Sequence, residues 1–216
     1  GAAKVSVFDL GLQYGYGFFE TIRVYNGKAD FLQEHIKRFN KAWLHLFSLA
    51  PPDLSWSEII RLLLERNNLM QGTAAVKILA TKGEPSNSST HPTIAISAKP
   101  YTHRLANSKK TGLRLLTYPE PRYTPLADYK TLNYLFYYLA GNWAKENGAD
   151  EALILNPDGT VSETNTANLI IIRKKTALVP ASPHVLPGIM QEKVLQVLSD
   201  RGYAIKKTGI RQHDFA

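Results

Sequence analysis

The stretch from Tyr123 to Asn168 constrains the fold more than any other part of this sequence. Pro119, Pro121 and Pro125 lie before Lys130, and their fixed φ keeps the approach to this lysine extended or turned. The apolar residues that follow recur at helical spacing, which predicts an amphipathic helix with this face buried. They are Leu132, Leu135, Phe136, Leu139 and Trp143. Asn147 and Gly148 are typical of a helix end.

A pair of strands follows the helix in the same stretch. Residues 151–155 (EALIL) predict a buried strand, and residues 156–159 (NPDG) predict a tight turn. Residues 161–163 start the return strand, and the apolar run at 167–172 predicts another strand. Lys130 is therefore expected at a strand-to-helix junction, and Glu163 is expected by a turn that comes back beside it.

Composition excludes several classes of site. The chain of 216 residues has no cysteine, so it has no disulfide, no thiolate metal site and no cysteine nucleophile. Its six histidines lack the spacing of a metal motif, and no metal is predicted. There is no Walker loop and no G-x-S-x-G serine. With neither a membrane-length apolar run nor a visible secretory signal, we expect a cytoplasmic protein with no membrane partner.

The formal net charge of +8 leaves two interpretations open. The basic residues are scattered, with short clusters only at 109–110, 173–175 and 206–207. Such clusters are usually solvated surface, and no nucleic-acid partner is predicted. A phosphorylated cofactor and a carboxylate substrate would each use a few of these charges.

The N-terminal third predicts a strand, a glycine loop and a hairpin. Residues 5–8 predict a short strand, and Gly11, Gly15 and Gly17 predict close backbone turns. The spacing of these glycines lacks the dinucleotide-binding fingerprint. Residues 18–25 predict a strand that ends in a hairpin turn at 26–27.

Two helices and two further strands are predicted before residue 100. The apolar spacing of residues 32–46 predicts a helix, and Arg38 lies beside its apolar face. An arginine in this place either packs its stem on the core or binds an anion with its guanidinium fork. Residues 55–67 predict a second helix with Ser57 as its cap. Strands are predicted at 73–80 and 92–97, joined by a polar loop at 82–91.

The sequence resembles the class IV aminotransferase family, the fold-type IV enzymes that use pyridoxal 5′-phosphate. The resemblance rests on K-T-L-N at 130–133, G-A-D-E-A-L-I-L at 148–155 and D-G-T-V-S-E-T-N-T-A-N-L at 158–169. It extends to residues 8–27 and 34–39, and to L-P-G-I-M at 186–190. It covers nearly the whole chain, and its relatives include branched-chain and D-amino-acid aminotransferases and aminodeoxychorismate lyase.

The resemblance implies an α/β (α+β) fold-type IV enzyme of two domains, similar to D-amino-acid aminotransferase, with the cofactor between them. A small N-terminal α/β domain is expected at 1–99, an interdomain linker at 100–112 and a cofactor-binding domain at 113–216. Family members usually continue with another strand and a phosphate-binding loop, so a truncated C-terminal part is expected. The family also implies a homodimer whose partner completes the substrate pocket.

The resemblance also implies roles for individual residues. Lys130 would hold the aldehyde cofactor as a Schiff base and, once freed, move the α-proton as a base. Glu163 would keep the pyridine nitrogen protonated, and Arg38 would bind the cofactor phosphate. The other expected cofactor contacts are Thr166, Asn168, Gly188, Ile189 and Met190. Taken alone, Gly188 is equally well a turn residue, but backbone amides at a helix start form an anion site.

The substrate and the reaction stay open at this point. Candidate substrate contacts are Tyr16, Thr21, Lys77 and His91. The loop after Lys82 departs from the family pattern because it lacks an arginine and carries Glu84. An aminotransferase of a small amino acid, acting through Lys130, is the first interpretation. The alternatives are 4-amino-4-deoxychorismate lyase, which gives 4-aminobenzoate and pyruvate from an amino-chorismate substrate, and a family member that has lost its activity.

Overall fold

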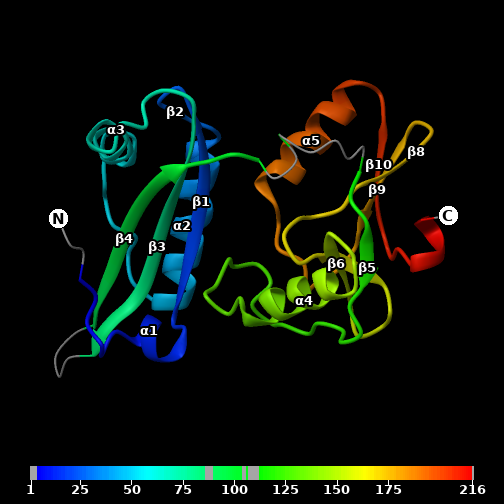
Figure 1. Cartoon of the computed structure of the whole chain (residues 1–216), viewed down its shortest axis with the longest axis horizontal. Coiled ribbons are helices and arrows are strands. Elements are labelled where there is room, and N and C mark those ends of the chain that lie inside the picture. The colour runs from blue at the N-terminus through cyan, green and yellow to red at the C-terminus, as the bar shows by residue number, and fades with distance from the viewer. Residues whose placement is uncertain (1–3, 86–89, 104–105, 107–111, 216) are drawn as a thin grey trace. The chain divides into compact units, whose positions relative to one another are not determined.

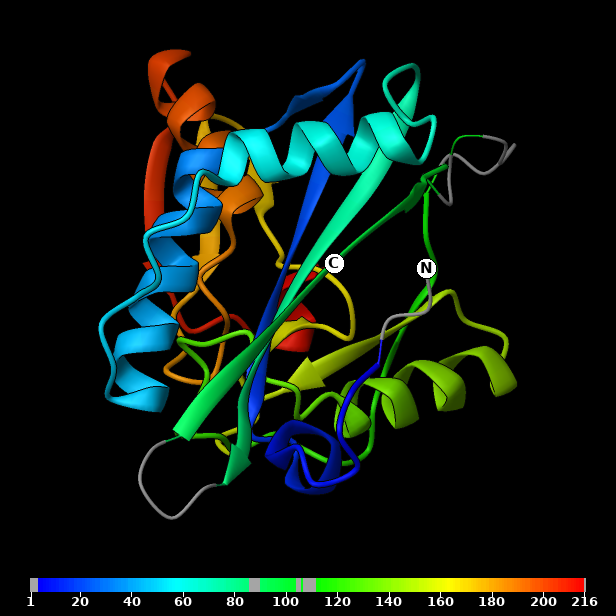
Figure 2. The ribbon, with the colours of Figure 1, turned by 90° about the vertical axis from the view of Figure 1, so that its left-hand side faces the viewer.

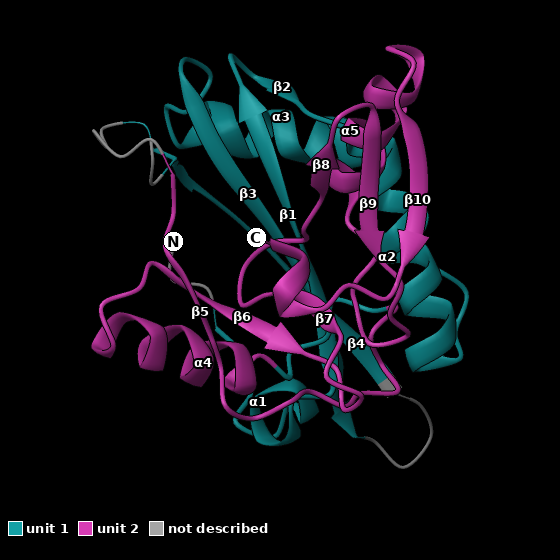
Figure 3. Ribbon diagram, turned by 90° about the vertical axis from the view of Figure 1, so that its right-hand side faces the viewer, with its two compact units in different colours: residues 1–109, 129–133 teal, residues 110–128, 134–216 magenta. Residues whose placement is uncertain are grey.

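The computed structural model describes residues 4–85, 90–103, 106 and 112–215 (Figure 1). Figure 3 colours the two compact units into which the chain divides: unit 1 contains residues 1–109 and 129–133, and unit 2 contains residues 110–128 and 134–216. The predicted linker at 100–112 lies largely outside the described residues. Both units contain helices and strands, which confirms the predicted mixed α/β class. Within the described ranges, no helix is both long and apolar enough to cross a membrane.

Unit 1 is built on an antiparallel sheet with the strand order β2-β1-β3-β4. β1 (Gly17–Tyr25) turns into β2 (Lys28–Ala29) through Asn26 and Gly27, whose φ angles of 46° and 76° suit the predicted hairpin. β3 (Thr73–Pro85) and β4 (Thr90–Pro100) both extend into the segment that was predicted as a polar loop. Their pairing shifts register between Thr81 and Glu84.

The core of unit 1 lies between one face of this sheet and two helices, α2 (Leu32–Phe47) and α3 (Trp56–Arg66) (Figure 2). Alternate residues of β1 point into the core, because successive side chains of a strand face opposite sides. The aromatic residues of the core are Phe18, Phe39, Trp43, Phe47 and Trp56. The predicted cap of α3 is wrong: the helix begins after Ser55 and not at Ser57.

The N-terminal segment also differs from its prediction. Residues 5–8 form no strand, and the predicted glycine loop contains the short helix α1 (Leu10–Tyr14). Asp9 caps this helix by accepting the Gly11 N–H at 2.7 Å, while its second oxygen accepts the hydroxyls of Thr81 and Thr93 at 2.8 and 2.9 Å. A Cβ on Gly11 would lie 2.2 Å from Thr81 Cγ2, so the close packing of α1 on β3 requires glycine there.

Residues 129–133 return from unit 2 to the edge of β1 in unit 1. Thr131 forms an antiparallel bridge with Phe18, and the Phe19 N–H donates to the Lys130 carbonyl at 2.9 Å. The Leu132 N–H donates to the Gly17 carbonyl at 2.9 Å. These backbone hydrogen bonds group Lys130 with the first unit, although the sequence places it within the expected C-terminal domain.

The described part of unit 2 contains two three-stranded sheets. In the first, β6 (Glu151–Leu155) pairs in parallel with β5 (Leu115–Thr117) and antiparallel with β7 (Val161–Thr164). In the second, β9 (Thr176–Pro180) lies between β8 (Ile171–Arg173) and β10 (Ala204–Thr208). The helices are α4 (Leu135–Glu146), α5 (Ile189–Asp200) and the 3₁₀ helix η1 (Gln212–Phe215).

The buried face of α4 is not the predicted one. Leu135 and Leu139 belong to the predicted stripe, but they are 68% and 50% exposed. The buried residues are Tyr137, Ala140, Gly141 and Ala144. The small side chains of Ala140, Gly141 and Ala144 let the backbone approach its neighbours closely, and a Cβ on Gly141 would lie 2.6 Å from Asn165 Nδ2. The helical period was therefore correct and its phase was wrong.

The strand predicted at 167–172 is shorter than expected, because β8 begins only at Ile171. A turn occupies the residues before it. The Thr164 N–H donates to the Ala167 carbonyl at 2.8 Å, and the Ala167 N–H donates to Thr164 Oγ1 at 2.9 Å. These two bonds close the chain on itself directly after β7, so the apolar run cannot pair with a neighbouring strand there.

Candidate active site

Lys130 and a second lysine of unit 1 both place their amines over the same aromatic ring. The Lys130 Nζ atom lies 5.0 Å from the centre of the Phe19 ring, and Lys77 Nζ lies 4.3 Å from the same centre. An aromatic face attracts a cation through its quadrupole. Phe19 comes from β1 and Lys77 from β3, while the backbone bonds described above hold Lys130 at the edge of β1. Two of the predicted site residues are therefore brought together here.

Arg38 forms a buried charge pair that the sequence did not predict. Its Nε and Nη2 atoms donate to the two carboxylate oxygens of Glu20, each at 2.7 Å, and His35 Nδ1 lies 2.7 Å from Glu20 Oε2. Glu20 is 1% exposed. Burial by itself raises the pKa of Glu20, but the hydrogen bonds and charges of Arg38 and His35 outweigh it, and the pKa is lowered. The bidentate geometry fixes the plane of the guanidinium.

The other predicted substrate residues of unit 1 lie in different places. Thr21 is the direct cross-strand neighbour of Lys77. Tyr16 follows α1 and is 56% exposed, and its carbonyl accepts the Lys82 N–H at 2.9 Å. His91 is exposed near the start of β4, paired with Glu84 of β3. The strand register thus places Thr21 beside Lys77.

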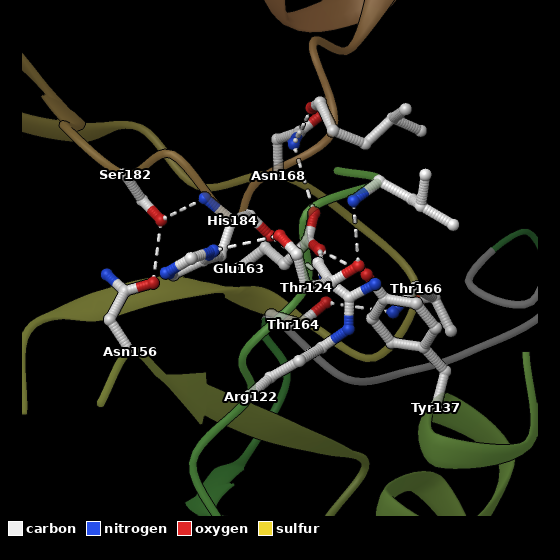
Figure 4. A network of polar contacts seen from close by, with 12 residues as sticks. Arg122, Thr124, Tyr137, Asn156, Glu163, Thr164, Thr166, Asn168, Ser182 and His184 are labelled. Carbon is white, nitrogen blue, oxygen red and sulfur yellow. Dashed lines mark hydrogen bonds and ion pairs between the residues drawn. The ribbon is translucent and has the colours of Figure 1, made fainter. Parts of the chain in front are cut away.

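Glu163 is the centre of the polar network in unit 2 (Figure 4). Its carboxylate is buried, with a side-chain exposure of 7%. The Tyr137 hydroxyl donates to Oε1 at 2.5 Å, and Asn168 Nδ2 lies 3.4 Å from Oε2. Burial, and then the neighbouring carboxylate, raise the pKa of Tyr137 far above its usual range, so its hydroxyl remains a proton donor.

Arg122 brings a positive charge into this network, as Figure 4 shows. Its guanidinium carbon lies 4.6 Å from the centre of the Tyr137 ring, and Nη1 donates to the His184 carbonyl at 2.9 Å. Nη1 is 3.9 Å from Glu163 Oε1, which is longer than a hydrogen bond. Arg122 therefore lies over the Tyr137 ring, and its Nη1 is too far from Glu163 Oε1 for a hydrogen bond.

The start of α5 is shaped by Asn168 and Gly188. Gly188 caps the helix without a side-chain hydrogen bond, and a Cβ on it would lie 1.8 Å from Asn168 Oδ1. Asn168 Nδ2 donates to the Leu186 carbonyl at 2.9 Å and so ties β7 to this turn. The N–H groups of the first helical turn, which includes Ile189 and Met190, attract anions. In contrast, the Thr166 hydroxyl donates to the buried Glu151, not to the helix start.

Three residues of this arrangement were missed by sequence reasoning. Glu20 lies on the buried side of β1 between Phe18 and Ile22, and a charge on an apolar stripe signals a buried partner. Tyr137 lies on the small-residue side of α4, so its burial would have followed from the correct helical phase. Arg122 carries no periodic signal, because it lies in an irregular segment between prolines.

Comparison with protein families gives one match that spans nearly the whole chain. A sequence profile described as "Amino-transferase class IV" matches residues 17–216. A "Putative branched-chain-amino-acid aminotransferase" of Methanocaldococcus jannaschii is 33% identical over 98% of this chain and 75% of its own length. A "D-alanine aminotransferase" of Staphylococcus haemolyticus is 30% identical over 95% of this chain and 74% of its own length. The chain spans only 40% of each of two similar Arabidopsis thaliana proteins.

Solved structures share the arrangement of the chain. The branched-chain aminotransferase of Thermoproteus uzoniensis has a TM-score of 0.84 and 27% identity, and the match covers 99% of this chain and 75% of that one. A structure described as "Putative 4-amino-4-deoxychorismate lyase" has a TM-score of 0.82 and 26% identity, and the match covers 99% of this chain and 82% of that one. Aminotransferases and a lyase are thus both similar to this chain.

Proposed function

The chain belongs to the class IV aminotransferase family, and we propose that it transfers the amino group of a small amino acid with pyridoxal 5′-phosphate as its cofactor. Family members are enzymes that depend on this cofactor. The observation that carries the proposal is Glu163, a carboxylate that is buried in β7 and bound by the Tyr137 hydroxyl at 2.5 Å. A buried acid of this kind suits a protonated ring nitrogen as its partner.

The residues of the candidate site fit this cofactor. Arg38, whose Nε and Nη2 are held by Glu20, would offer the outer side of its guanidinium to a phosphate, and the start of α5 offers backbone N–H groups that no side chain caps. Gly188 lacks the Cβ that would occupy the space beside Asn168. We assign the phosphate to Arg38 and to the amides of Ile189 and Met190. Asn168 and Thr166 would support these contacts from the turn after β7.

Lys130 would be the point of covalent attachment and the base of the reaction. When bound, the cofactor supplies an electron sink for the negative charge that develops at the substrate Cα. The Lys130 amine would take the proton from the substrate Cα and deliver it to the aldehyde-derived carbon of the cofactor, and taking that proton requires the neutral form of the amine. Glu163 keeps the proton on the ring nitrogen throughout. Lys77 and Thr21, which are neighbours across β1 and β3, would receive the substrate carboxylate.

Borohydride reduction of the loaded protein, followed by peptide mapping, tests this proposal. The expected adduct is on Lys130, and Lys130→Ala should abolish it. Lys77→Ala is the matched control, because Lys77 presents a second amine at the same Phe19 ring and its loss should leave the adduct in place. An adduct on Lys77, or on any other lysine of the wild type, would overturn the assignment.

The lyase is the second candidate, and the solved structure described as an aminodeoxychorismate lyase favours it. The two reactions differ in their need for a keto acid. An aminotransferase should consume one equivalent of amino acid per site, stop, and resume when a keto acid is added. Sustained release of pyruvate from aminodeoxychorismate without any keto acid would instead identify the lyase.

A further inference from the structure

Arg38 and Arg122 contact buried glutamates in different ways. Arg38 binds Glu20 directly, with both nitrogen–oxygen distances at 2.7 Å. Arg122 Nη1 stays 3.9 Å from Glu163 Oε1, although both side chains are largely buried, with exposures of 14% and 7%. Oppositely charged groups in a buried place attract strongly at such distances. A specific contact is therefore needed to keep this second pair apart.

The Tyr137 side chain supplies that contact. Its hydroxyl donates to Oε1 at 2.5 Å, and the guanidinium carbon of Arg122 lies over its ring, 4.6 Å from the centre. Figure 4 shows the ring and hydroxyl in this position. The same ring thus engages the cation with its face and the carboxylate with its hydroxyl. Arg122 Nη1 also donates a hydrogen bond to the His184 carbonyl at 2.9 Å.

We propose that Tyr137 is a positioning residue that holds Glu163 for the cofactor ring nitrogen and keeps Arg122 from pairing directly with it. This inference rests on the proposed function, because it needs Glu163 to act on that nitrogen. Tyr137 and Arg122 both lie on the Oε1 side of the carboxylate, whereas Asn168 Nδ2 lies 3.4 Å from Oε2. Without the hydroxyl, Arg122 can close the remaining gap and draw the carboxylate toward itself. A direct ion pair would then compete with the ring nitrogen for the same charge.

The affinity of the apoenzyme for two cofactors distinguishes a positioning role of Tyr137 from a general structural role. One is pyridoxal 5′-phosphate, and the other is its carbocyclic analogue, in which CH replaces the ring nitrogen. Each dissociation constant is measured by titrating the apoenzyme and following its tryptophan fluorescence. Tyr137→Phe should weaken pyridoxal 5′-phosphate by about tenfold, the scale of one hydrogen bond to a charged group. It should leave the affinity for the analogue nearly unchanged, because the analogue has no nitrogen for Glu163 to meet.

The matched control is Tyr138→Phe, which removes a hydroxyl from the next residue of α4, where the side chain is 63% exposed. It should change neither affinity. Tyr137→Gln keeps an N–H donor near the same place and should retain most of the affinity. Equal losses for the cofactor and its analogue, or equal losses in Tyr137→Phe and Tyr138→Phe, would overturn the inference.

A double-mutant cycle tests the part played by Arg122. In the Arg122→Gln background the competing charge is gone, so Tyr137→Phe should cost only about twofold in cofactor affinity. The same tenfold loss in both backgrounds would rule out the spacing role. Glu163→Gln distinguishes a failure of the Tyr137 inference from a failure of the proposed function. If it weakens the cofactor and its analogue equally, then the pairing of Glu163 with the ring nitrogen is itself wrong.

Discussion

Glu20 and Glu163 are buried carboxylates with different surroundings. Glu20 is bound directly by Arg38 and His35, which makes it part of a closed charge cluster inside unit 1. Glu163 is bound by the neutral hydroxyl of Tyr137, with its cation held back. Arg38 and His35 compensate the charge of Glu20, whereas the Tyr137 hydroxyl orients the Glu163 carboxylate. We therefore expect substitutions at the two sites to differ in their effects on stability and on cofactor binding.

Arg38→Ala should affect both stability and cofactor affinity. Removing Arg38 leaves the buried Glu20 with only His35 of this charge cluster, which costs up to about 3–5 kcal/mol in the free energy of unfolding. The double variant Glu20→Gln/Arg38→Ala should recover much of that stability, as measured by chemical denaturation. It should still bind pyridoxal 5′-phosphate about ten- to a hundredfold more weakly, because the guanidinium is absent.

Arg61→Ala is the control for this comparison. Arg61 pairs with Glu65 on the exposed side of α3, and such pairs contribute about 0–1 kcal/mol. A double variant with wild-type affinity for the cofactor would show that Arg38 serves only to compensate Glu20.

The charge cluster of Glu20 also predicts how stability depends on pH. The pKa of Glu20 is lowered from an ordinary value of 4.5 in the folded protein, so the folded state binds fewer protons than the unfolded state as the pH falls below that value. The stabilisation is complete above 4.5 and is lost as the pH falls through the lowered pKa. Denaturation curves between neutral and acid pH should show a shallower acid loss for Glu20→Gln. Parallel pH profiles would contradict this cause.

Single residues of the site were predictable where the sequence carried a motif. Lys130 and Glu163 belong to specific flanking sequences, so they were named without the structure. Their roles stay predictions. Tyr137 and Arg122 could not be found in this way, because their positions depend on the phase of α4 and on the path of an irregular segment. Both follow from tertiary packing, which local patterns do not encode.

Among the elements, the start of α5 gives a prediction that depends on space alone. Gly188→Ala would place a Cβ 1.8 Å from Asn168 Oδ1, so the asparagine or the helix start must move. We expect affinity for pyridoxal 5′-phosphate to fall by about tenfold, the scale of one lost charge-assisted contact. Gly112→Ala is the control, because a Cβ there meets no atom within 4 Å. Equal affinities in the two variants would mean that this helix start does not bind the phosphate.

The elements themselves were mostly predictable from their periods. The hairpin at Asn26 and Gly27, the helix α2 and the strand β6 follow from local signals. The failures share a physical cause. α1 depends on Asp9 reaching two threonines far along the chain, and the buried face of α4 depends on close approach through Gly141. Long-range contacts decided these cases, and side-chain hydrophobicity alone pointed the other way.

At the scale of the whole molecule, we expect a homodimer, which α4 supports through its exposed apolar residues. Leu135, Tyr138 and Leu139 lie at helical spacing on its outer side, with exposures of 68%, 63% and 50%. Light scattering should give twice the chain mass of 24.1 kDa. Leu135→Glu/Leu139→Glu should lower that mass toward the monomer, because charges oppose burial. Leu62→Glu, on the exposed side of α3, is the control.

A monomeric wild type would contradict the expected dimer. A dimer that persists in the double variant, with the same dissociation constant as the Leu62→Glu control, would exclude α4 from the interface.

The return of residues 129–133 to the edge of β1 bears on how this chain is made. Residues 1–109 are synthesised before Thr131, so the bridge to Phe18 forms only after residues 110–128 of unit 2 have been added to the chain. Until then, the Gly17 carbonyl and the Phe19 N–H lack the hydrogen bonds that they make with Leu132 and Lys130 in the folded protein. Completion of the first unit is therefore coupled to the arrival of Lys130. A nascent chain that stops short of this residue lacks both the candidate attachment point for the cofactor and the last edge of its first sheet.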